Sequence, residues 1–194
     1  MSDEARKILD AVDAKLAVAR KGWRDMRSPE HFQAGLWNAA VFGRNATFTL
    51  QNLRSAVKNF DDWYGPKQSA MKADPVMTYF VEYRNKIEKS VADSTTASAS
   101  LSFSTEELRK AMGRPPPNAK SFFIGDQFGG NGWEVVMPDG SIEKIYVDLP
   151  KEIASTKAHL PAAPGDADRS ANELVDEYLT KLEALAKEAR STFL

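Results

Sequence analysis

The 194-residue chain is 42% hydrophobic and 10% aromatic, which supplies a packed core and excludes a disordered polypeptide. It contains no cysteine, so disulfides, thiol catalysis and thiolate metal sites are excluded. No apolar run reaches the length of about 18 residues that suggests a membrane span, and the N-terminal segment lacks the apolar centre of a secretory signal. These features predict a cytoplasmic protein that does not cross a membrane.

The formal net charge of −1 is divided unevenly along the chain. Residues 1–92 contain 15 lysines and arginines against 11 acidic residues, whereas residues 93–194 contain 11 against 16. A mildly basic half can meet nucleic acid or an acidic partner. Alternatively, the two halves attract each other, within the chain or across a dimer.

Two amphipathic helices are predicted in the first third of the chain. Residues 3–22 carry apolar side chains at steps of three and four, which places them in one stripe. Ser28-Pro29 marks the next helix start, with Ser28 as the cap, and a near-heptad apolar pattern continues from there to Phe60. We expect one long helix over that stretch, with Gly43 permitting close packing of a neighbouring helix.

Four asparagines recur every seven residues along this long helix. A step of seven drifts by only about 20° around a helix, so the four side chains form one polar row. The row is either a solvated stripe or a polar seam against a partner helix, where a buried amide would fix the register. Its members are Asn38, Asn45, Asn52 and Asn59.

Further helices complete a predicted antiparallel bundle over residues 1–92. The segment from Asp61 to Pro66 is expected to break the helical pattern, and a shorter helix follows to about Met71. Asp74-Pro75 then starts another helix that runs to about Ser90, with Asp74 as its cap.

Residues 93–168 are predicted to form a small antiparallel β element with loops. The run DSTTASAS at 93–100 has the composition of a flexible connector, but the alternation that continues to Ser104 favours an edge strand, and a short helix begins near Thr105. A strand at 121–125 precedes a hairpin with arms at 133–137 and 141–148, joined by Pro138-Asp139-Gly140. Residues 155–168 are expected to be loop.

Residues 169–194 are predicted to form a C-terminal amphipathic helix. The helix is expected from Ala171 to Arg190, with an apolar stripe from Leu174 to Ala189. A lone helix cannot bury such a face, so we expect it to pack back on the bundle. The predicted fold class is therefore α+β: an N-terminal antiparallel helical bundle, a small antiparallel β element and a returning C-terminal helix.

The most informative residues are Arg84-Asn85, within the stretch FVEYRNKIEKS at residues 80–90. Arg84 emerges at the margin of the apolar stripe, where its stem is buried and its guanidinium faces a groove or an interface. A purely local interpretation is also open. In it, Arg84 pairs with Glu88, and Glu82 with Lys86, four residues apart on one helix.

This stretch resembles the motif of HEPN domains, a helical-bundle family of prokaryotic defence and toxin systems. Their motif is an arginine, often followed by asparagine, with a histidine four to six residues on. The resemblance implies a homodimer in which arginine and histidine face a cleft and cleave RNA without a metal. Here Lys89 stands where the histidine would fall, and a protonated lysine is a poor general base, although it can hold phosphate.

Other candidate residues have simpler structural explanations. His31 and His159 lie in unrelated contexts and do not form a metal-ligand spacing. The glycine-rich segment 125–132 lacks the lysine-serine or lysine-threonine pair of a phosphate-binding loop, and its glycines suit a link between strands. Trp63 and Trp133 are expected in the core or in domain packing.

These features predict a non-catalytic binding or assembly module of degenerate HEPN-like type, with binding residues Arg84, Asn85 and Lys89. The resemblance alone implies a bacterial defence or regulatory role and a homodimer or protein partner. Nucleic acid is a further candidate partner, and no cofactor or metal is expected. One alternative is a metal-independent ribonuclease or nucleotide-modifying enzyme that uses Arg84, Asn85 and either Lys89 or His31. The other is a small-ligand sensor that closes the glycine-rich segment over a small molecule.

Overall fold

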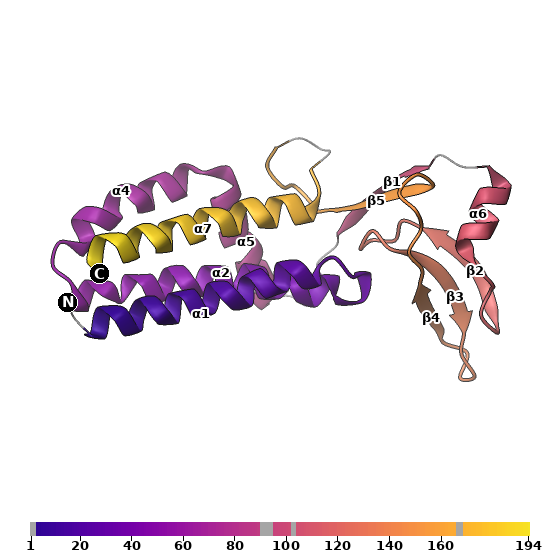
Figure 1. Cartoon of the computed structure of the whole chain (residues 1–194), viewed down its shortest axis with the longest axis horizontal. Helices are drawn as coiled ribbons and strands as arrows, with labels where there is room; N and C mark the ends of the chain where they lie inside the picture. The colour runs from indigo at the N-terminus through magenta and orange to yellow at the C-terminus, as the bar shows by residue number, and fades with distance from the viewer. Residues whose placement is uncertain (1–2, 90–94, 102–103, 166–168) are drawn as a thin grey trace. The chain divides into compact units, whose positions relative to one another are not determined.

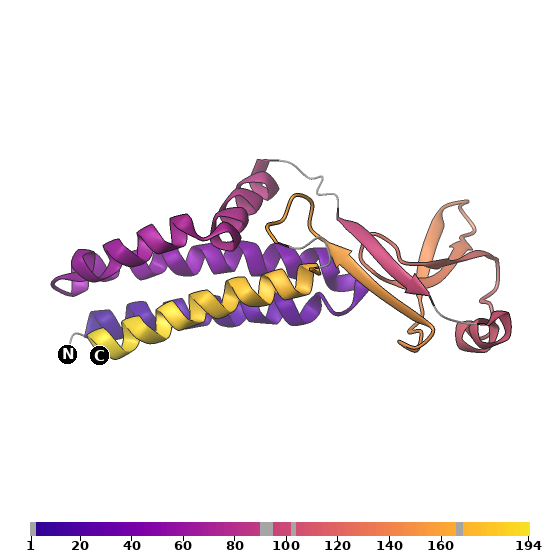
Figure 2. The same cartoon turned by 90° about the horizontal axis from the view of Figure 1, so that it is seen from above.

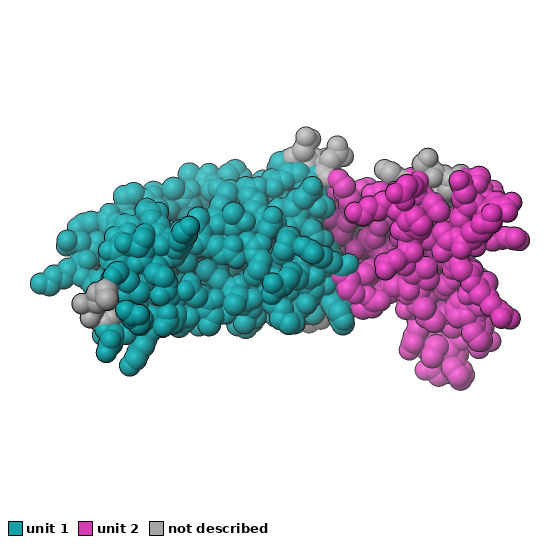
Figure 3. Space-filling view, in the orientation of Figure 1, with its two compact units in different colours: residues 1–27, 31–93, 163–194 teal, residues 28–30, 94–162 magenta. Residues whose placement is uncertain are grey.

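The computed structural model describes residues 3–89, 95–101, 104–165 and 169–194, and confirms the α+β fold class. The chain divides into two compact units, coloured separately in Figure 3. The helical unit contains residues 1–27, 31–93 and 163–194, and the β unit contains residues 28–30 and 94–162. The predicted boundaries at 92/93 and 168/169, and the predicted helix end near Ser90, fall outside the described residues.

The helical unit is an antiparallel bundle. Figures 1 and 2 show α1 and α7 side by side, with α1 beginning at the end of the bundle where α7 finishes. The helices are α1 (Asp3–Asp25), α2 (Pro29–Gln51), α3 (Leu53–Ala56), α4 (Phe60–Ala73), α5 (Pro75–Lys89) and α7 (Ala171–Phe193).

The C-terminal helix packs back on the bundle, as predicted. Ser170 and Glu173 form a capping box that starts α7, and its apolar stripe is buried from Ala171 to Ala189. At one end of the α1–α7 pair, Arg20 donates to Asp176 and Glu183 of α7. The apolar stripe therefore supplies the burial, and ion pairs along its margin favour the antiparallel orientation.

Two glycines set how closely α1 and α2 approach. A Cβ on Gly22 would lie 2.5 Å from the carbonyl oxygen of Gly35, and a Cβ on Gly35 would lie 2.5 Å from the carbonyl oxygen of Gly22. Side chains at either position would collide with backbone. The crossing of these helices therefore depends on glycine at both positions.

The prediction of one long helix from Ser28 to Phe60 is wrong. The helix begins at Pro29 as expected, but α2 ends at Gln51 and the short α3 ends at Ala56. Val57 is then extended and Asn59 adopts a left-handed conformation with φ of 59°. Asparagine tolerates the left-handed conformation better than most residues. Asn59, which was predicted to lie in the long helix, therefore lies in the turn that ends it.

The predicted break at Asp61–Pro66 is also wrong, because these residues lie inside α4. Phe60, which begins α4, and Tyr64 are buried, and Phe60 and Trp63 lie against Phe193 of α7. The burial of this aromatic cluster outweighs the one backbone hydrogen bond that Pro66 cannot donate.

The start of α5 is as predicted. Asp74 caps it, since its Oδ1 accepts from the amides of Val76 at 2.9 Å and Met77 at 3.1 Å. The other carboxylate oxygen of Asp74 accepts from Lys181 of α7. One side chain thus both begins α5 and ties it to α7.

The β unit contains two antiparallel sheets and one short helix. A two-stranded sheet pairs β1 (Thr96–Leu101) with β5 (Ala154–His159), and a three-stranded sheet has the order β2–β3–β4. Its strands are Ala119–Ile124, Asn131–Val136 and Ile142–Tyr146. The short helix, α6 (Thr105–Met112), begins at a capping box formed by Ser104 and Glu107.

The predictions for the β unit are partly correct. The β3–β4 hairpin turns at the predicted Pro138-Asp139-Gly140, where Gly140 has a φ of +83°. The expectation of a loop over residues 155–168 is wrong for 155–159, which belong to β5, and correct for 160–165, which form neither helix nor strand; residues 166–168 are outside the described ranges. That strand has no large β-forming side chain, and it is held by pairing with β1 and by burial of Ala154 and Ala158.

Candidate functional site

Arg84 takes part in a local ion pair. Its guanidinium lies 2.7 Å from the Glu88 carboxylate and donates to the Asn85 side chain at 3.2 Å. Its Nε is buried without a hydrogen-bond partner. Arg84 and Glu88 therefore form the ion pair between residues four positions apart that the local interpretation of the motif predicted.

The described residues place the other candidate site residues apart from Arg84 or in solvent. Asn85 and Lys89 are exposed, and within the described residues no hydrogen bond or ion pair joins Arg84 to Lys89 or His31. His159 belongs to the β unit, where its Nε2 lies 2.6 Å from Ser98 Oγ. The four asparagines do not form one row on one helix, because Asn52 precedes α3 and Asn59 lies in the turn before α4; Asn38, Asn52 and Asn59 are exposed and Asn45 is half-buried.

The glycine-rich segment is organised around its own carboxylate. Asp126, whose side chain is 5% exposed, accepts from the amides of Phe128 and Gly130 at 3.0 Å each. It also accepts from the Tyr146 hydroxyl at 2.7 Å and from Lys144 at 3.0 Å. Burial would raise the pKa of Asp126, but these donors outweigh it and lower the pKa. The amides that could hold a phosphate thus already bind an internal anion.

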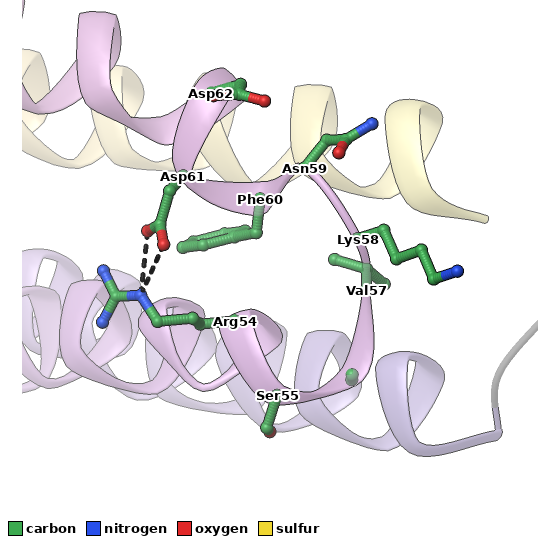
Figure 4. Close-up of a pocket in the computed structure, with 9 residues that line it drawn as sticks. Arg54, Ser55, Val57, Lys58, Asn59, Phe60, Asp61 and Asp62 are labelled. Carbon is green, nitrogen blue, oxygen red and sulfur yellow. Dashed lines mark hydrogen bonds and ion pairs between the residues drawn. The ribbon is translucent and has the colours of Figure 1, made fainter.

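A concavity of about 650 Å³ lies at the turn between α3 and α4 (Figure 4). Consecutive residues 54–62 line it, so it is the hollow of one turn rather than a meeting point of several helices. Arg54 donates to both carboxylate oxygens of Asp61, at 2.8 and 3.1 Å. Both side chains are more than half exposed, and their charges neutralise each other.

A second cavity, of about 330 Å³, lies among four helices of the bundle, and we call it the helical cleft. From α2 it is lined by Arg44, Thr47, Phe48 and Gln51. From α4 it is lined by Tyr64, Gln68, Met71 and Lys72. The remaining lining residues are Met77, Thr78 and Val81 of α5 and Tyr178 of α7.

The floor of the helical cleft is buried and fixed in place. Tyr64, Met77 and Tyr178 are at most 6% exposed. The Tyr178 ring stacks on Phe80, with centroids 4.5 Å apart, and passes so close to α2 that a Cβ on Gly43 would lie 2.6 Å from it. Gly43 thus permits the close packing that was predicted for it, against a ring of the cleft floor.

Arg44 and the hydroxyls of Tyr64 and Tyr178 are hydrogen-bonding groups of the helical cleft, which is also lined by the polar residues Thr47, Gln51, Gln68, Lys72 and Thr78. The guanidinium of Arg44 stacks over Phe48 at 4.3 Å and donates to Thr47 Oγ1 at 3.2 Å. Burial raises the pKa of Tyr64 and Tyr178, although the charge of Arg44 opposes the rise. Both hydroxyls are therefore protonated at neutral pH and can act as donors.

Sequence reasoning missed the helical cleft. Its lining residues come from positions 44–81 and 178, so no local motif joins them. One signal was available, since residues 31–60 contain Arg44, Arg54 and Lys58 but no acidic residue. Arg44 consequently has no carboxylate three or four positions away on its helix, and so no local ion-pair partner.

The described residues contain no cluster of three or more His, Cys, Asp or Glu side chains that could hold a metal ion. Within the same ranges, no helix is both long and apolar enough to cross a membrane.

Comparison with known proteins assigns the chain to a family other than the predicted HEPN family. No curated protein and no solved structure matches the chain. A family model described as bacteriophage lambda protein ea47 matches residues 1–104. The HEPN assignment is therefore wrong. It rested on a two-residue motif, and the structure uses Arg84 of that motif in a local pair with Glu88. Because the match covers more than half of its residues, the chain belongs to the bacteriophage lambda protein ea47 family.

Proposed function

We propose that the protein is a non-catalytic binding module whose helical unit holds a small organic molecule in the helical cleft. The observation that carries this proposal is the cleft itself: a cavity of about 330 Å³ with a buried aromatic floor, built from four helices. Small-molecule sites are commonly cavities of about 300–1,000 Å³ with mainly apolar walls and a few polar groups. The helical cleft lies at the lower end of that range of volumes, and it combines apolar surface from methionine, valine and aromatic side chains with polar residues.

The chemistry of the lining supports binding rather than catalysis. None of the twelve lining residues is a histidine, carboxylate, serine or cysteine, which are the usual general bases and nucleophiles. The tyrosine hydroxyls have raised pKa values, so they donate hydrogen bonds and do not remove protons near neutrality. These side chains can hold a ligand and orient it.

A thermal-shift screen of a diverse small-molecule library tests this function, since a ligand that binds only the folded state raises the melting temperature. Each hit is repeated on Val81→Phe, in which a larger side chain fills the cleft from α5. We expect hits that stabilise the wild type and not Val81→Phe. A library that yields no hit sensitive to Val81→Phe would contradict the proposal.

A further inference from the structure

We infer that the helical cleft selects an organic anion, namely a molecule with a carboxylate or phosphate head group and an apolar body. This inference rests on the proposed function and names the class of ligand. It depends on three features: the sign of the charge in the lining, the partners of Arg44, and the apolar part of the cavity.

The lining carries two positive charges and no negative charge. Arg44 and Lys72 are the ionised side chains among its residues, and no aspartate or glutamate accompanies them. Two like charges without a counter-ion attract an anion and repel a cation. The concavity at residues 54–62 differs in this respect, because Asp61 and Asp62 accompany its cations.

Arg44 differs from the other half-buried arginines of the described residues. Arg20, Arg84, Arg169 and Arg190 each lie within 4 Å of a carboxylate. Arg44 is also half-buried, but it has no carboxylate partner within the described part of the chain. Its guanidinium has five N–H donors, of which the contact to Thr47 uses one. Its planar face rests on Phe48, so the guanidinium is oriented and retains donors for a carboxylate or phosphate.

The rest of the cavity suits an apolar body. Met71, Met77, Val81 and the rings of Tyr64 and Tyr178 supply apolar surface beside the two cations. A volume of 330 Å³ equals that of about eleven water molecules in the liquid, which suits a small aromatic or short-chain molecule. A fully hydrated inorganic ion would leave this apolar surface uncovered, so the inferred ligand combines both parts.

Calorimetric titration with four ligands that share one apolar body tests the inference. The ligands are phenylbutyrate, phenylbutyl phosphate, neutral phenylbutanamide and cationic phenylbutylamine. We expect one or both anions to bind at least about tenfold more tightly than the amide and the amine, because a charge-assisted hydrogen bond is stronger than a neutral one. The two anions also distinguish a carboxylate from a phosphate preference.

Matched variants assign any selectivity to the cleft. Arg44→Gln and Lys72→Gln each remove one lining cation, and Lys58→Gln removes an exposed cation outside the cleft. Either lining variant should lose most of the preference for anions, whereas Lys58→Gln should keep it. Because two lining variants are available, the test survives if one of them fails to fold.

The outcomes separate this inference from the proposed function. If the amide or the amine binds as tightly as the anions, and this binding is lost in Val81→Phe, the cleft binds small molecules without selecting anions. That result would overturn the inference and would support the proposed function. An equal loss of selectivity in Lys58→Gln would also overturn the inference, since overall charge would then explain the preference. Failure of all four ligands overturns the inference, and the proposed function falls with it only if the library screen is also negative.

Discussion

At the scale of single residues, the same side-chain type has different roles according to its partners. Arg84 belongs to the most suggestive motif in the sequence, yet it pairs with Glu88 one turn away. Arg44 belongs to no motif and faces a cavity that contains no carboxylate. Spacing on a helix can predict the first situation, because both partners lie on one element. It cannot predict the second, because the cavity is formed by four helices.

Replacing Arg84 tests whether its role is only local. Arg84→Met keeps an apolar stem, removes the pair with Glu88, and removes the buried Nε that lacks a partner. We expect the free energy of unfolding, measured in urea, to stay within about 0.5 kcal/mol of the wild type. A loss of more than about 2 kcal/mol would show that Arg84 contributes far more than the pair observed here.

In contrast to Arg84, the two glycines between α1 and α2 are positions where we expect substitution to reduce stability. Gly22→Ala and Gly35→Ala each place a Cβ 2.5 Å from a backbone oxygen, so the helices must move apart. We expect each variant to lose about 1–3 kcal/mol of unfolding free energy. Lys21→Ala is the control at an exposed neighbouring position and should change stability by about 0.5 kcal/mol or less. Equal effects at all three positions would contradict the close crossing.

At the scale of elements, contacts between helices decide where helices end and how they are joined. The aromatic cluster holds Asp61–Pro66 in α4 against local expectation, and the left-handed Asn59 separates α3 from α4. Asp74 caps α5 and binds Lys181 of α7. The cap was predictable from the sequence, whereas the lysine lies 107 positions away and was not.

The pair of Asp74 and Lys181 gives stability a pH dependence. Burial would raise the pKa of Asp74, but Lys181 and the amides of Met77 and Val76 outweigh it and lower the pKa. A lowered carboxyl pKa contributes stability that is present above the unfolded-state pKa of about 4 and is lost as the pH falls through the folded-state value.

Asp74→Asn isolates this contribution, because asparagine also caps helices but carries no charge. At pH 7 we expect the wild type to be more stable by about 1 kcal/mol, measured by urea unfolding. The difference should shrink as the pH falls below about 4. A difference that stays constant or grows on acidification would contradict the assigned role.

At the scale of the whole molecule, the sequence predicted the class of fold better than the function. The α+β class, the returning C-terminal helix and the β3–β4 hairpin follow from apolar periodicity, caps and turn residues. The strand β5 was missed because Thr156 is its one strand-favouring residue, and the strand depends on pairing with β1. The helical cleft was missed because Arg44, Met77 and Tyr178 meet only in the folded bundle.

The family assignment also changes what the whole chain is expected to do. The predicted homodimer and RNA cleavage were implied by the HEPN resemblance, and that family is replaced by the bacteriophage lambda protein ea47 family. The proposed function therefore depends on the helical cleft, which has a buried floor and two lining cations without a lining carboxylate.

Methyl NMR of the methionines tests this central claim most directly, because these residues report on different parts of the molecule. Met71 and Met77 line the helical cleft, Met26 is buried elsewhere in the helical unit, and Met112 and Met137 belong to the β unit. On titration with whichever of phenylbutyrate and phenylbutyl phosphate binds more tightly, we predict saturable shifts of the Met71 and Met77 methyl signals and unchanged signals from Met26, Met112 and Met137. Saturable shifts confined to Met112 or Met137, or no shift at Met71 and Met77 under saturating ligand, would contradict the account.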